Sequence, residues 1–400
     1  MMMILKALVF FLPVLPFVTA DHNSQGLAEK TWHVSESTLP KPLSDLSAAL
    51  APNGLIYIAG GCDAVDGNVF NNATGFLECA SLSDSFYSYN PKTGTVVTLP
   101  NMPMERYRHA SVATSANQIW LVGGRNLTDA QILEIDVFDI ASGTWSTIGS
   151  LPEDLGTSDN AAFAKNDDVF VAGGYNASYG ALTNVLLLTR PSGSAAVVTE
   201  QLAPLLEARG DVKAVSDGKT VAYISGGFTH ENSYCPSLDT VERYTFSTNT
   251  WESLPPLHTG RGDKALALLG GYLYALGGET QVQGLCDLTD PEPGERTVVV
   301  DDVEIFRDGN WTILPSIPER RFRFEAVGYD EEHAIYTFGG QKPFNTTCQC
   351  YRTTDEILIY IDGIHDDDSS DDESAAPNIN NLVSVGVITT FAGVMLFDFF

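Results

Sequence analysis

The 400-residue sequence is poor in basic residues, with 22 Lys and Arg against 51 Asp and Glu and a formal net charge of −29. A chain with this excess of negative charge repels another polyanion, which argues against a nucleic acid as its partner. The excess indicates solubility and carries no information about the fold.

The sequence motifs of several enzyme classes are absent. There is no phosphate-binding Gly-x-x-x-x-Gly-Lys-Ser/Thr loop and no Gly-x-Ser-x-Gly elbow, and the seven histidines are scattered. No pattern of histidines accompanies the cysteines, so a zinc site is not expected either. We therefore expect no metal and no other cofactor, and the sequence alone identifies no catalytic residue.

What the sequence does contain is a repeat marked by six Gly-Gly pairs, each of which ends a short apolar run. The second glycines are residues 61, 124, 174, 227, 278 and 340, at intervals of 63, 50, 53, 51 and 62 residues. Each pair is followed by an aromatic strand, a strand that often holds Trp, and a Leu-Pro step, as at Tyr244, Trp251 and Leu254-Pro255. Each unit is therefore predicted to be four short antiparallel strands, which bury both faces only when like units stack radially.

The order Gly-Gly, Tyr, Trp, Leu-Pro and Arg resembles the kelch repeat. Six copies imply an all-β fold, a six-bladed kelch β-propeller that extends over residues 21–364. Its blades are predicted to start near residues 43, 103, 155, 206, 260 and 319.

Two units depart from the regular pattern. The last unit supplies only three strands, and the segment 30–35 around Trp32 has the pattern of a fourth strand. The N-terminal strand is therefore expected to complete blade six and to leave no open edge. Blade three has Leu188 and Val197 where Tyr and Trp are expected, so its wall is predicted to be less aromatic.

The N-terminus has the features of a targeting segment. Residues 1–20 combine one Lys, an apolar stretch and the small-residue ending Val18-Thr19-Ala20, which is typical of a cleaved signal peptide. A membrane anchor is the alternative, but the apolar stretch is short for a span.

The C-terminus is predicted to attach the protein to a membrane. Residues 365–381 are acidic and polar and should form a disordered stalk, and residues 382–400 are apolar throughout most of their length. As a helix this tail would be about 28 Å long, near the thickness of a bilayer core. No basic residue follows Arg352, so we expect a glycosylphosphatidylinositol (GPI) signal, with a type I transmembrane helix as the alternative. Ser374 is the preferred attachment residue and Ser370 the second choice.

Glycosylation sites and cysteines follow the glycine pairs. Four of the five sequons and all six cysteines lie between the second and third predicted strands of their units. The N-glycosylation candidates are Asn72, Asn126, Asn176, Asn310 and Asn345. An even cysteine count in an exported chain predicts disulfides among Cys62, Cys79, Cys235, Cys286, Cys348 and Cys350. Cys235 can pair with Cys286, and the other four can pair within blade one and within Cys348-Gln349-Cys350, or across the closure.

The loops after the glycine pairs are long in blades one and five and intermediate in blades four and six. Loops held on a rigid scaffold often carry binding residues, so this sector is predicted to be a recognition surface. The turns that link successive blades should open onto the same face, and they hold Arg at a nearly fixed distance before the next glycine pair. The kelch resemblance implies binding of an acidic peptide, carboxylate, sulfate or sugar acid there. The ligand-binding candidates are Arg106, Arg108, His109, Arg209, Arg261, Arg321 and Arg323.

An alternative interpretation is that Arg belongs to the repeat and pairs with neighbouring acids. Those neighbours would be Glu105, Glu207, Asp263 and Glu319. The two Arg-Gly-Asp triplets, 209–211 and 261–263, match the integrin-binding tripeptide, but they stand at equivalent repeat positions. The repeat accounts for both triplets.

Together these features predict a glycoprotein of the secretory pathway, either secreted or held on the extracellular face of the plasma membrane. It would be a monomer that binds an extracellular protein or a glycan. The alternative is a carbohydrate-acting enzyme that resembles the exported kelch sialic acid mutarotases, with Glu207 and Arg209 or His109 assisting anomer exchange. Galactose oxidase shares the repeat, but its set of copper ligands is not identified in this sequence. Fold analogy alone supports either enzyme.

Overall fold

The computed structural model describes residues 30–66, 68–71, 76–190, 197–229, 236–282 and 297–363. The predicted signal peptide, the acidic stalk, the C-terminal tail and Ser374 lie outside these ranges. Asn72, Cys235 and Cys286 lie outside them as well. In the described part of the chain, no helix is both long and apolar enough to span a bilayer.

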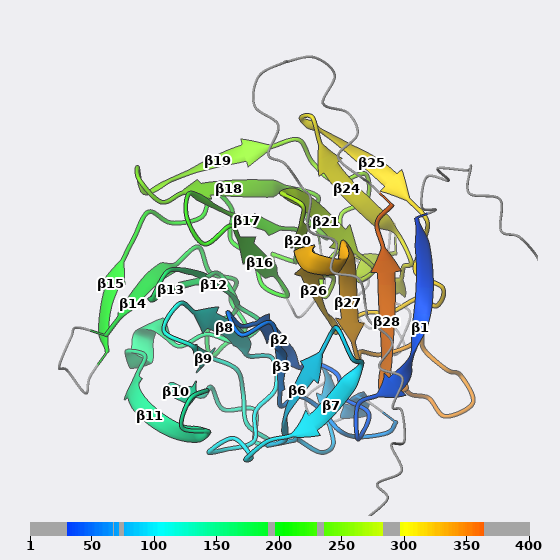
Figure 1. Ribbon diagram of the computed structural model, residues 1–400, viewed down its shortest axis with the longest axis horizontal. Helices are drawn as coiled ribbons and strands as arrows, with labels where there is room; N and C mark the ends of the chain where they lie inside the picture. Colours follow the sequence, from blue (N-terminus) through cyan, green and yellow to red (C-terminus); the bar gives the residue numbers. More distant parts are fainter. Residues whose placement is uncertain are drawn as a thin grey trace, which may run out of the picture. The chain divides into compact units, whose positions relative to one another are not determined.

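Six four-stranded antiparallel sheets are arranged in a ring, as the sequence predicts (Figure 1). Blade one contains β2 (Ser47–Leu50), β3 (Ile56–Ala59), β6 (Phe86–Asn90) and β7 (Thr95–Thr98). Blade two contains β8 (Ala110–Thr114), β9 (Gln118–Val122), β10 (Glu134–Asp139) and β11 (Thr144–Ser150). Blade three contains β12 (Ala161–Lys165), β13 (Asp168–Ala172), β14 (Val185–Thr189) and β15 (Val198–Gln201).

The other three blades repeat this plan. Blade four contains β16 (Lys213–Ser216), β17 (Val221–Ser225), β18 (Val241–Thr245) and β19 (Thr250–Leu254). Blade five contains β20 (Ala265–Leu269), β21 (Tyr272–Leu276), β24 (Val303–Arg307) and β25 (Asn310–Leu314). Blade six contains β26 (Glu325–Tyr329), β27 (Ala334–Phe338), β28 (Glu356–Ile361) and β1 (Thr31–Thr38).

The N-terminal strand closes the ring, which confirms the predicted closure. β1 pairs antiparallel with β28, and Trp32 lies opposite Tyr360. The indole Nε1 of Trp32 donates to the carbonyl oxygen of Pro315 in blade five at 3.0 Å. Trp311 donates in the same way to Pro255 at 2.8 Å, and Trp145 to Pro100 at 2.9 Å. Trp32 thus joins neighbouring blades in the same way as Trp145 and Trp311.

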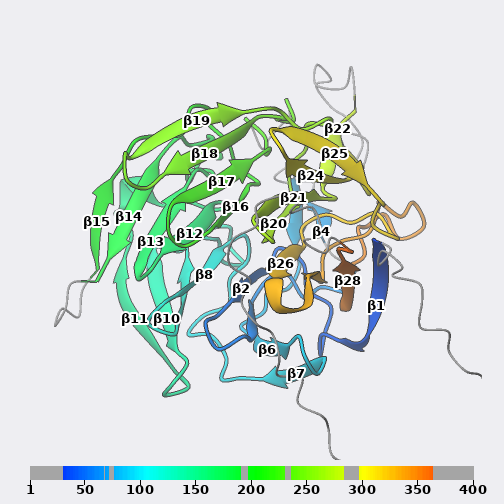
Figure 2. The same ribbon diagram turned by 45° about the horizontal axis from the view of Figure 1, so that its top comes forward.

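The first strand of each blade faces the centre. β2, β8, β12, β16, β20 and β26 pack side by side around a channel (Figure 2). Between blades three and four, aromatic side chains fill the wedge, with Phe163 stacked on Phe170 at a centroid distance of 5.1 Å. The wedge between blades two and three is aliphatic apart from Trp120, and it includes Leu188. Blade three therefore has the predicted less aromatic wall only on its side toward blade two, because its own Phe163 and Phe170 make the wall toward blade four aromatic.

The glycine pairs are required by backbone geometry. Gly60 and Gly61 have φ values of +56° and +102°, in the region that residues with a side chain rarely adopt. A Cβ at Gly61 would also lie 2.3 Å from the carbonyl oxygen of Ser44. The N–H of Gly61 donates to the carbonyl oxygen of Arg106 in the next blade, and all six blades repeat this bond at 2.8 to 3.0 Å.

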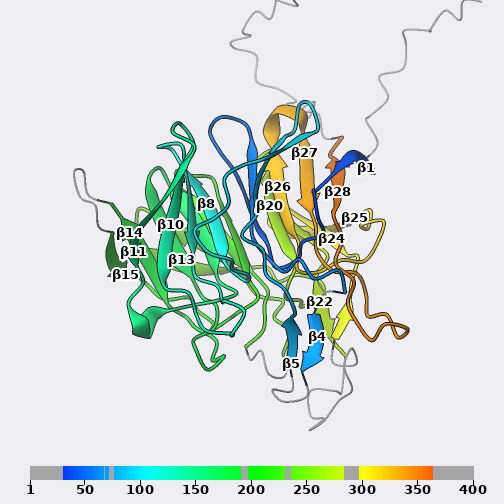
Figure 3. The same ribbon diagram turned by 90° about the horizontal axis from the view of Figure 1, so that it is seen from below.

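Two small hairpins extend the loops between second and third strands. β4 (Asn68–Asn71) pairs with β5 (Phe76–Cys79) in blade one, and β22 (Glu279–Gln281) pairs with β23 (Thr297–Val299) in blade five. Seen from the side, β4, β5 and β22 extend from the same end of the ring (Figure 3). We call this end the loop face, and the end formed by the tight turns between strands one and two and between strands three and four the hairpin face.

Candidate binding face

The loop face is built where each interblade turn meets the residue after a glycine pair. In blade two, Tyr107 in the turn forms an isolated antiparallel β-bridge with Arg125, which follows the glycine pair. Arg125 forms a second such β-bridge with Gln131. Blades one, three, four and six repeat this three-way contact, and Gly262 bridges Glu279 in blade five. The sequence prediction that the two kinds of loop share one face agrees with these bridges.

Four of the arginines predicted to bind a ligand are buried, and each forms an ion pair within one blade. Arg106, Arg209, Arg261 and Arg321 have no exposed side-chain surface. Each pairs with a carboxylate from the third strand of the blade that follows the turn. The pairs are Arg106 with Asp136, Arg209 with Glu242 at 2.6 Å, Arg261 with Glu304 at 2.6 Å and Arg321 with Glu356 at 2.5 Å.

The repeat itself explains why these arginines come with acids. At the equivalent position blades one and three have Leu43 and Thr157, and their third strands have Tyr87 and Leu186 in place of the carboxylate. The acid is thus present only where the Arg is present. Ligand binding by the four arginines stays a prediction, and a ligand would have to compete with these carboxylates, of which all but the one-third exposed Glu356 are buried.

The central ring of the loop face consists of six buried residues with positive φ. In five blades, the backbone N–H of this residue donates to the carbonyl oxygen of the corresponding residue in the preceding blade. In blade four the donor is the next residue, Val212. The φ values lie between +50° and +58°. The members, here called the central ring, are Asp45, Arg108, Asp159, Asp211, Asp263 and Arg323.

The charges of the central ring pair with one another. Asp45 lies between the two guanidinium groups, with its Oδ1 at 3.9 Å from Nε of Arg108 and 3.7 Å from Nε of Arg323. Arg108 also approaches Asp159 at 3.6 Å, and Arg323 approaches Asp263 at 2.9 Å. Burial raises the pKa of Asp45 although both arginines oppose the shift. Among the arginines predicted to bind a ligand, Arg108 and Arg323 are the two in the central ring. Both form ion pairs with carboxylates there.

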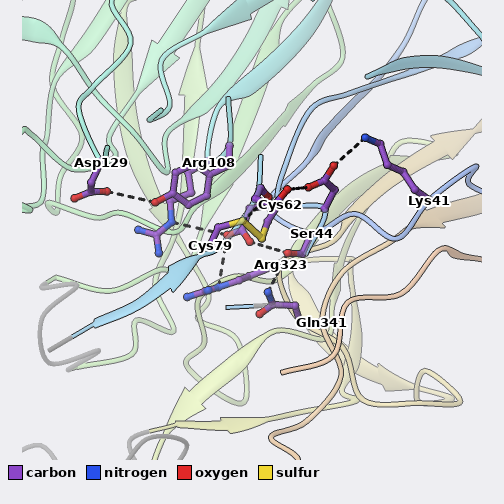
Figure 4. The surroundings of a disulfide bond; sticks show 12 residues. Lys41, Ser44, Cys62, Cys79, Arg108, Asp129, Arg323 and Gln341 are labelled. Atoms are coloured by element: carbon purple, nitrogen blue, oxygen red, sulfur yellow. Dashed lines mark hydrogen bonds and ion pairs between the residues drawn. A yellow bond between two sulfur atoms is a disulfide. The ribbon is translucent and has the colours of Figure 1, made fainter. Parts of the chain in front are cut away.

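The side chains that follow the glycine pairs form a second layer over the central ring. The size of each is complementary to that of the turn residue beneath it. Tyr175 and Phe228, which follow glycine pairs, pack over Gly210 and Gly262, where an added Cβ would lie 2.3 and 2.2 Å from ring carbons. Where the covering residue is smaller, the turn residue is larger, as for Cys62 with Tyr107. Near the closure the amide of Gln341 donates to the hydroxyl of Ser44 at 3.0 Å (Figure 4).

Both Arg-Gly-Asp triplets are accounted for by this construction. In the first triplet, Arg209 is paired with Glu242, Gly210 lies under Tyr175, and Asp211 is only 5% exposed and accepts from the Tyr175 hydroxyl at 2.9 Å. The triplet is therefore not presented to solvent as an adhesion motif would be.

Glu279 on this face has a carboxyl group with a strongly raised pKa. It follows the glycine pair of blade five, is 2% exposed and accepts from the hydroxyl of Thr297 at 2.6 Å. Burial, the nearby charge of Asp263 and a hydrogen bond to that carboxylate raise its pKa to about 8, against the effect of Arg323. The group therefore titrates near neutral pH in the folded protein.

His109 lies below the face and away from the proposed acid and base partners. It is 2% exposed, and its Nε2 lies 2.8 Å from the hydroxyl of Ser47 in blade one. Burial and the charges of Arg106 and Lys213 hold its pKa well below the usual range. Glu207 instead accepts from the hydroxyl of Thr240 at 2.7 Å. The structure therefore does not assemble His109 with Glu207 as an acid and base pair.

The two disulfides within the described residues are the within-blade pairs that the sequence left open. Cys62 bonds to Cys79 in blade one, and Cys348 bonds to Cys350 in blade six. Figure 4 places the first disulfide beside Ser44 and the arginines of the central ring. The predicted pair of Cys235 and Cys286 lies outside the described residues.

Among the described sequons, Asn176 and Asn310 are exposed and Asn126 and Asn345 are half-buried. The side-chain oxygen of Asn126 accepts from the N–H and hydroxyl of Thr128 at 2.9 and 2.8 Å, and that of Asn176 accepts from the N–H of Ser178 at 2.9 Å. Both bonds fix local turns at the surface. Glycosylation at all five positions stays a prediction.

Sequence reasoning named Asp263 as an acid that pairs with arginine, but it did not identify the other acidic members of the central ring or the ion pair between Lys213 and Glu325 inside the channel. The four aspartates could have been found, because they stand two residues after the arginine position in their blades. The partners of the buried arginines could not, because the third-strand acids lie 30 to 43 residues further along the chain in all four pairs.

Comparisons with known proteins agree on one kind of repeat. The model of the Kelch motif family matches residues 46–103 and 218–258. Kelch-like protein 36 of Mus musculus is 27% identical over 247 residues, covering 61% of this chain and 37% of that protein. Kelch repeat protein M-T8 of Myxoma virus (strain Lausanne) is 25% identical over 268 residues, covering 66% of this chain and 47% of that protein. The chain thus matches less than half the length of these relatives.

A solved structure, that of YjhT, has the same fold. It superimposes with a TM-score of 0.62 at 15% identity, and the match covers 80% of this chain and 95% of YjhT. At this identity the likeness concerns the fold alone.

Proposed function

Because the chain is a kelch-repeat β-propeller, we propose that it is an interaction module that binds a protein partner through the loop face of blades four, five, six and one. We further propose that the protein acts outside the cell, secreted or anchored to the plasma membrane as a glycoprotein. The observation that carries the proposal is the uneven distribution of loop length, disulfides and charge around the ring.

Charge decides which partner this sector favours. Between their second and third strands, blades one, four, five and six hold fourteen acidic and three basic residues, in segments 62–85, 228–240, 279–302 and 341–355. The corresponding segments of blades two and three, 125–133 and 175–184, hold one of each. Complementary charge accelerates association and selects partners, so the sector favours a basic protein surface.

The buried arginines support the same choice. A partner that offers carboxylates or sulfates would need free guanidinium groups, yet four of the predicted arginines are paired within their blades and have no exposed side-chain surface. Disulfides in blades one and six hold parts of the sector rigid, which lowers the entropy lost on binding. A glycan ligand and a carbohydrate-acting enzyme remain the competing functions, and neither is favoured by a particular contact of this face.

The proposal is tested with the full chain displayed on cells and a panel of purified extracellular protein domains. A specific partner should bind, and its binding should weaken when salt rises from physiological to several times that value. Replacement of residues 283–296 in blade five by a neutral Gly-Ser linker of equal length should reduce binding. The control replaces residues 191–196, which stand between β14 and β15 in the sequence, with the same type of linker.

Two results would contradict the proposal. One is a partner whose binding is lost with the control replacement and kept with the blade-five replacement. The other is selective binding of a glycan array component together with turnover of that sugar, which would assign the chain to the enzyme class.

A further inference from the structure

The central channel contains a pocket on the side away from the loop face. Its volume is about 700 Å³, within the range of small-molecule sites. One end of the pocket is formed by Asn160, Lys213 and Glu325, which stand one or two residues after members of the central ring. The other end reaches the hairpin turns, at Pro52 and Asp330 among others. The pocket therefore opens toward the hairpin face, and the central ring lies beyond its inner end.

An ion pair crosses the inner end of this pocket. Nζ of Lys213, at the start of β16, contacts Oε1 of Glu325, at the start of β26. The side chains are 25% and 10% exposed, so both charges are largely withdrawn from bulk water. Burial opposes the charge on Lys213, but Glu325, Asp263 and Asp159 raise its pKa above the usual value. The amine is therefore held in its charged form.

The fold does not require these two charges. The same first position of the inner strand is occupied by small, uncharged residues in the other four blades, namely Ser47, Ala110, Ala161 and Ala265. A buried ion pair is also seldom more stabilising than apolar residues of the same volume, because both charges lose their hydration. A pair placed where the repeat otherwise has alanine therefore indicates a function of the pocket.

The walls of the pocket are small and mostly apolar. Alanines from every inner strand line it, together with Val112 and Val215. Two hydroxyl groups in this lining, those of Ser111 and Thr114, are buried and have no hydrogen-bond partner among the described residues. The inner end of the pocket thus combines one ammonium group and one carboxylate with unused hydroxyls and an apolar wall, while Asp217, Lys219 and Asp330 line its outer end.

We propose that this pocket binds a small zwitterion of the amino-acid type, whose carboxylate pairs with Lys213 and whose ammonium group pairs with Glu325. A ligand with only one charge would displace one member of the pair and leave the other buried and unpaired, which is costly. A zwitterion replaces one ion pair by two. Its apolar side chain lies against the alanine wall. The site is at the opposite end from the loop face and does not depend on the function proposed there.

The test uses the full chain and three probes that share one isobutyl side chain and differ in their charged groups. L-Leucine carries both charges, leucinamide carries only the cation, and 4-methylpentanoate carries only the anion. Calorimetric titration and saturation-transfer NMR should detect leucine, with each singly charged analogue bound at least about tenfold more weakly. Failure to bind leucine, or equal binding of all three probes, would overturn the proposal.

Variants identify the site. Lys213→Met and Glu325→Gln should each weaken leucine binding by about tenfold or more. Lys92→Met and Glu331→Gln are the matched controls, because that ion pair is 59% and 61% exposed and lies on the hairpin turns. These controls should leave binding unchanged. If a single variant unfolds, the reversed pair Lys213→Glu with Glu325→Lys keeps both charges and should retain leucine binding. Unchanged binding in the two channel variants would place the ligand elsewhere and refute the assignment.

Discussion

At the scale of single residues, the fold raises the pKa of the Glu279 carboxyl group and so makes the stability of the protein depend on pH. Its pKa is about 8, against 4.5 for an ordinary glutamate, because the carboxyl group is buried beside Asp263. A carboxyl group with a raised folded-state pKa stabilises the fold most below its unfolded pKa, and that contribution is lost as pH rises toward the folded value. The free energy of unfolding should therefore fall between pH 4.5 and about 8 through this residue.

The variant Glu279→Gln should remove that slope. The amide keeps an acceptor for Thr297 and can donate to Asp263, and it does not ionise. We expect the variant to be more stable than the parent at pH 8 to 9 and no more stable at pH 4, by urea unfolding. Arg323 and Tyr351 also contact this group electrostatically and are unchanged in the comparison. Exposed Glu105→Gln is the control, and an equal change of slope in both variants would contradict the assignment.

The buried arginines can be tested through their acids. Arg106→Leu leaves Asp136 buried and unpaired, so we expect a loss of about 3–5 kcal/mol in the free energy of unfolding. The double variant Arg106→Leu with Asp136→Leu should recover most of that loss, because blades one and three have uncharged residues at both positions. Urea unfolding of the four proteins of the cycle gives the coupling energy. A double variant as unstable as the sum of the single ones would show that the pair has no special role.

At the scale of single elements, size matching determines how each turn meets the neighbouring blade. Gly210→Ala places a Cβ 2.3 Å from the ring of Tyr175, which is fully buried and cannot move aside. We expect a loss of about 1–3 kcal/mol, as for other overpacked cores. In the Tyr175→Ala background the same substitution should cost much less, measured by thermal unfolding. Gly262→Ala with Phe228→Ala repeats the test in the next blade, and additive losses in both cycles would refute size matching.

Strand β1 is the second element whose role can be isolated. Removal of residues 30–38 would expose the backbone edge of β28 and delete the bond from Trp32 to Pro315. We expect a lower melting temperature and concentration-dependent association, measured by light scattering, because open strand edges recruit other chains. A synthetic peptide of residues 30–38 should restore both properties in trans. Removal of residues 21–29 alone is the control, and a monomeric, unchanged β1 deletion would contradict the proposed closure.

The sequence predicted elements well and side-chain partners poorly. The glycine pairs, the aromatic strands and the Trp32 segment were sufficient to predict six blades and their closure, because each depends on local geometry repeated six times. The same repeat placed the arginine backbone correctly at the loop face. It could not reveal that Arg209 points into its own blade toward Glu242, since that contact depends on packing between strands. Lys213 and Glu325 are 112 residues apart, beyond any local signal.

At the scale of the whole molecule, the proposed attachment to a membrane can be tested on cells. We propose a lipid anchor attached at Ser374. Phosphatidylinositol-specific phospholipase C should therefore release the protein from intact cells, detected by antibody in the medium. Ser374→Leu should reduce surface display, with Thr354→Ser in the described part of the chain as a neutral control. Retention after phospholipase treatment would instead identify a transmembrane helix.

The central ring also has a consequence for how the protein unfolds. An open array of repeats has a first and a last member, so unfolding can begin at either end and stop part of the way. Here the backbone hydrogen bonds of the central ring run from Asp45 through Arg108 and Asp159 around to Arg323 and return to Asp45, so no blade is terminal. Loss of any one blade breaks the circle on both sides of it. The six blades should therefore melt together in a single transition, although each one is built from local contacts.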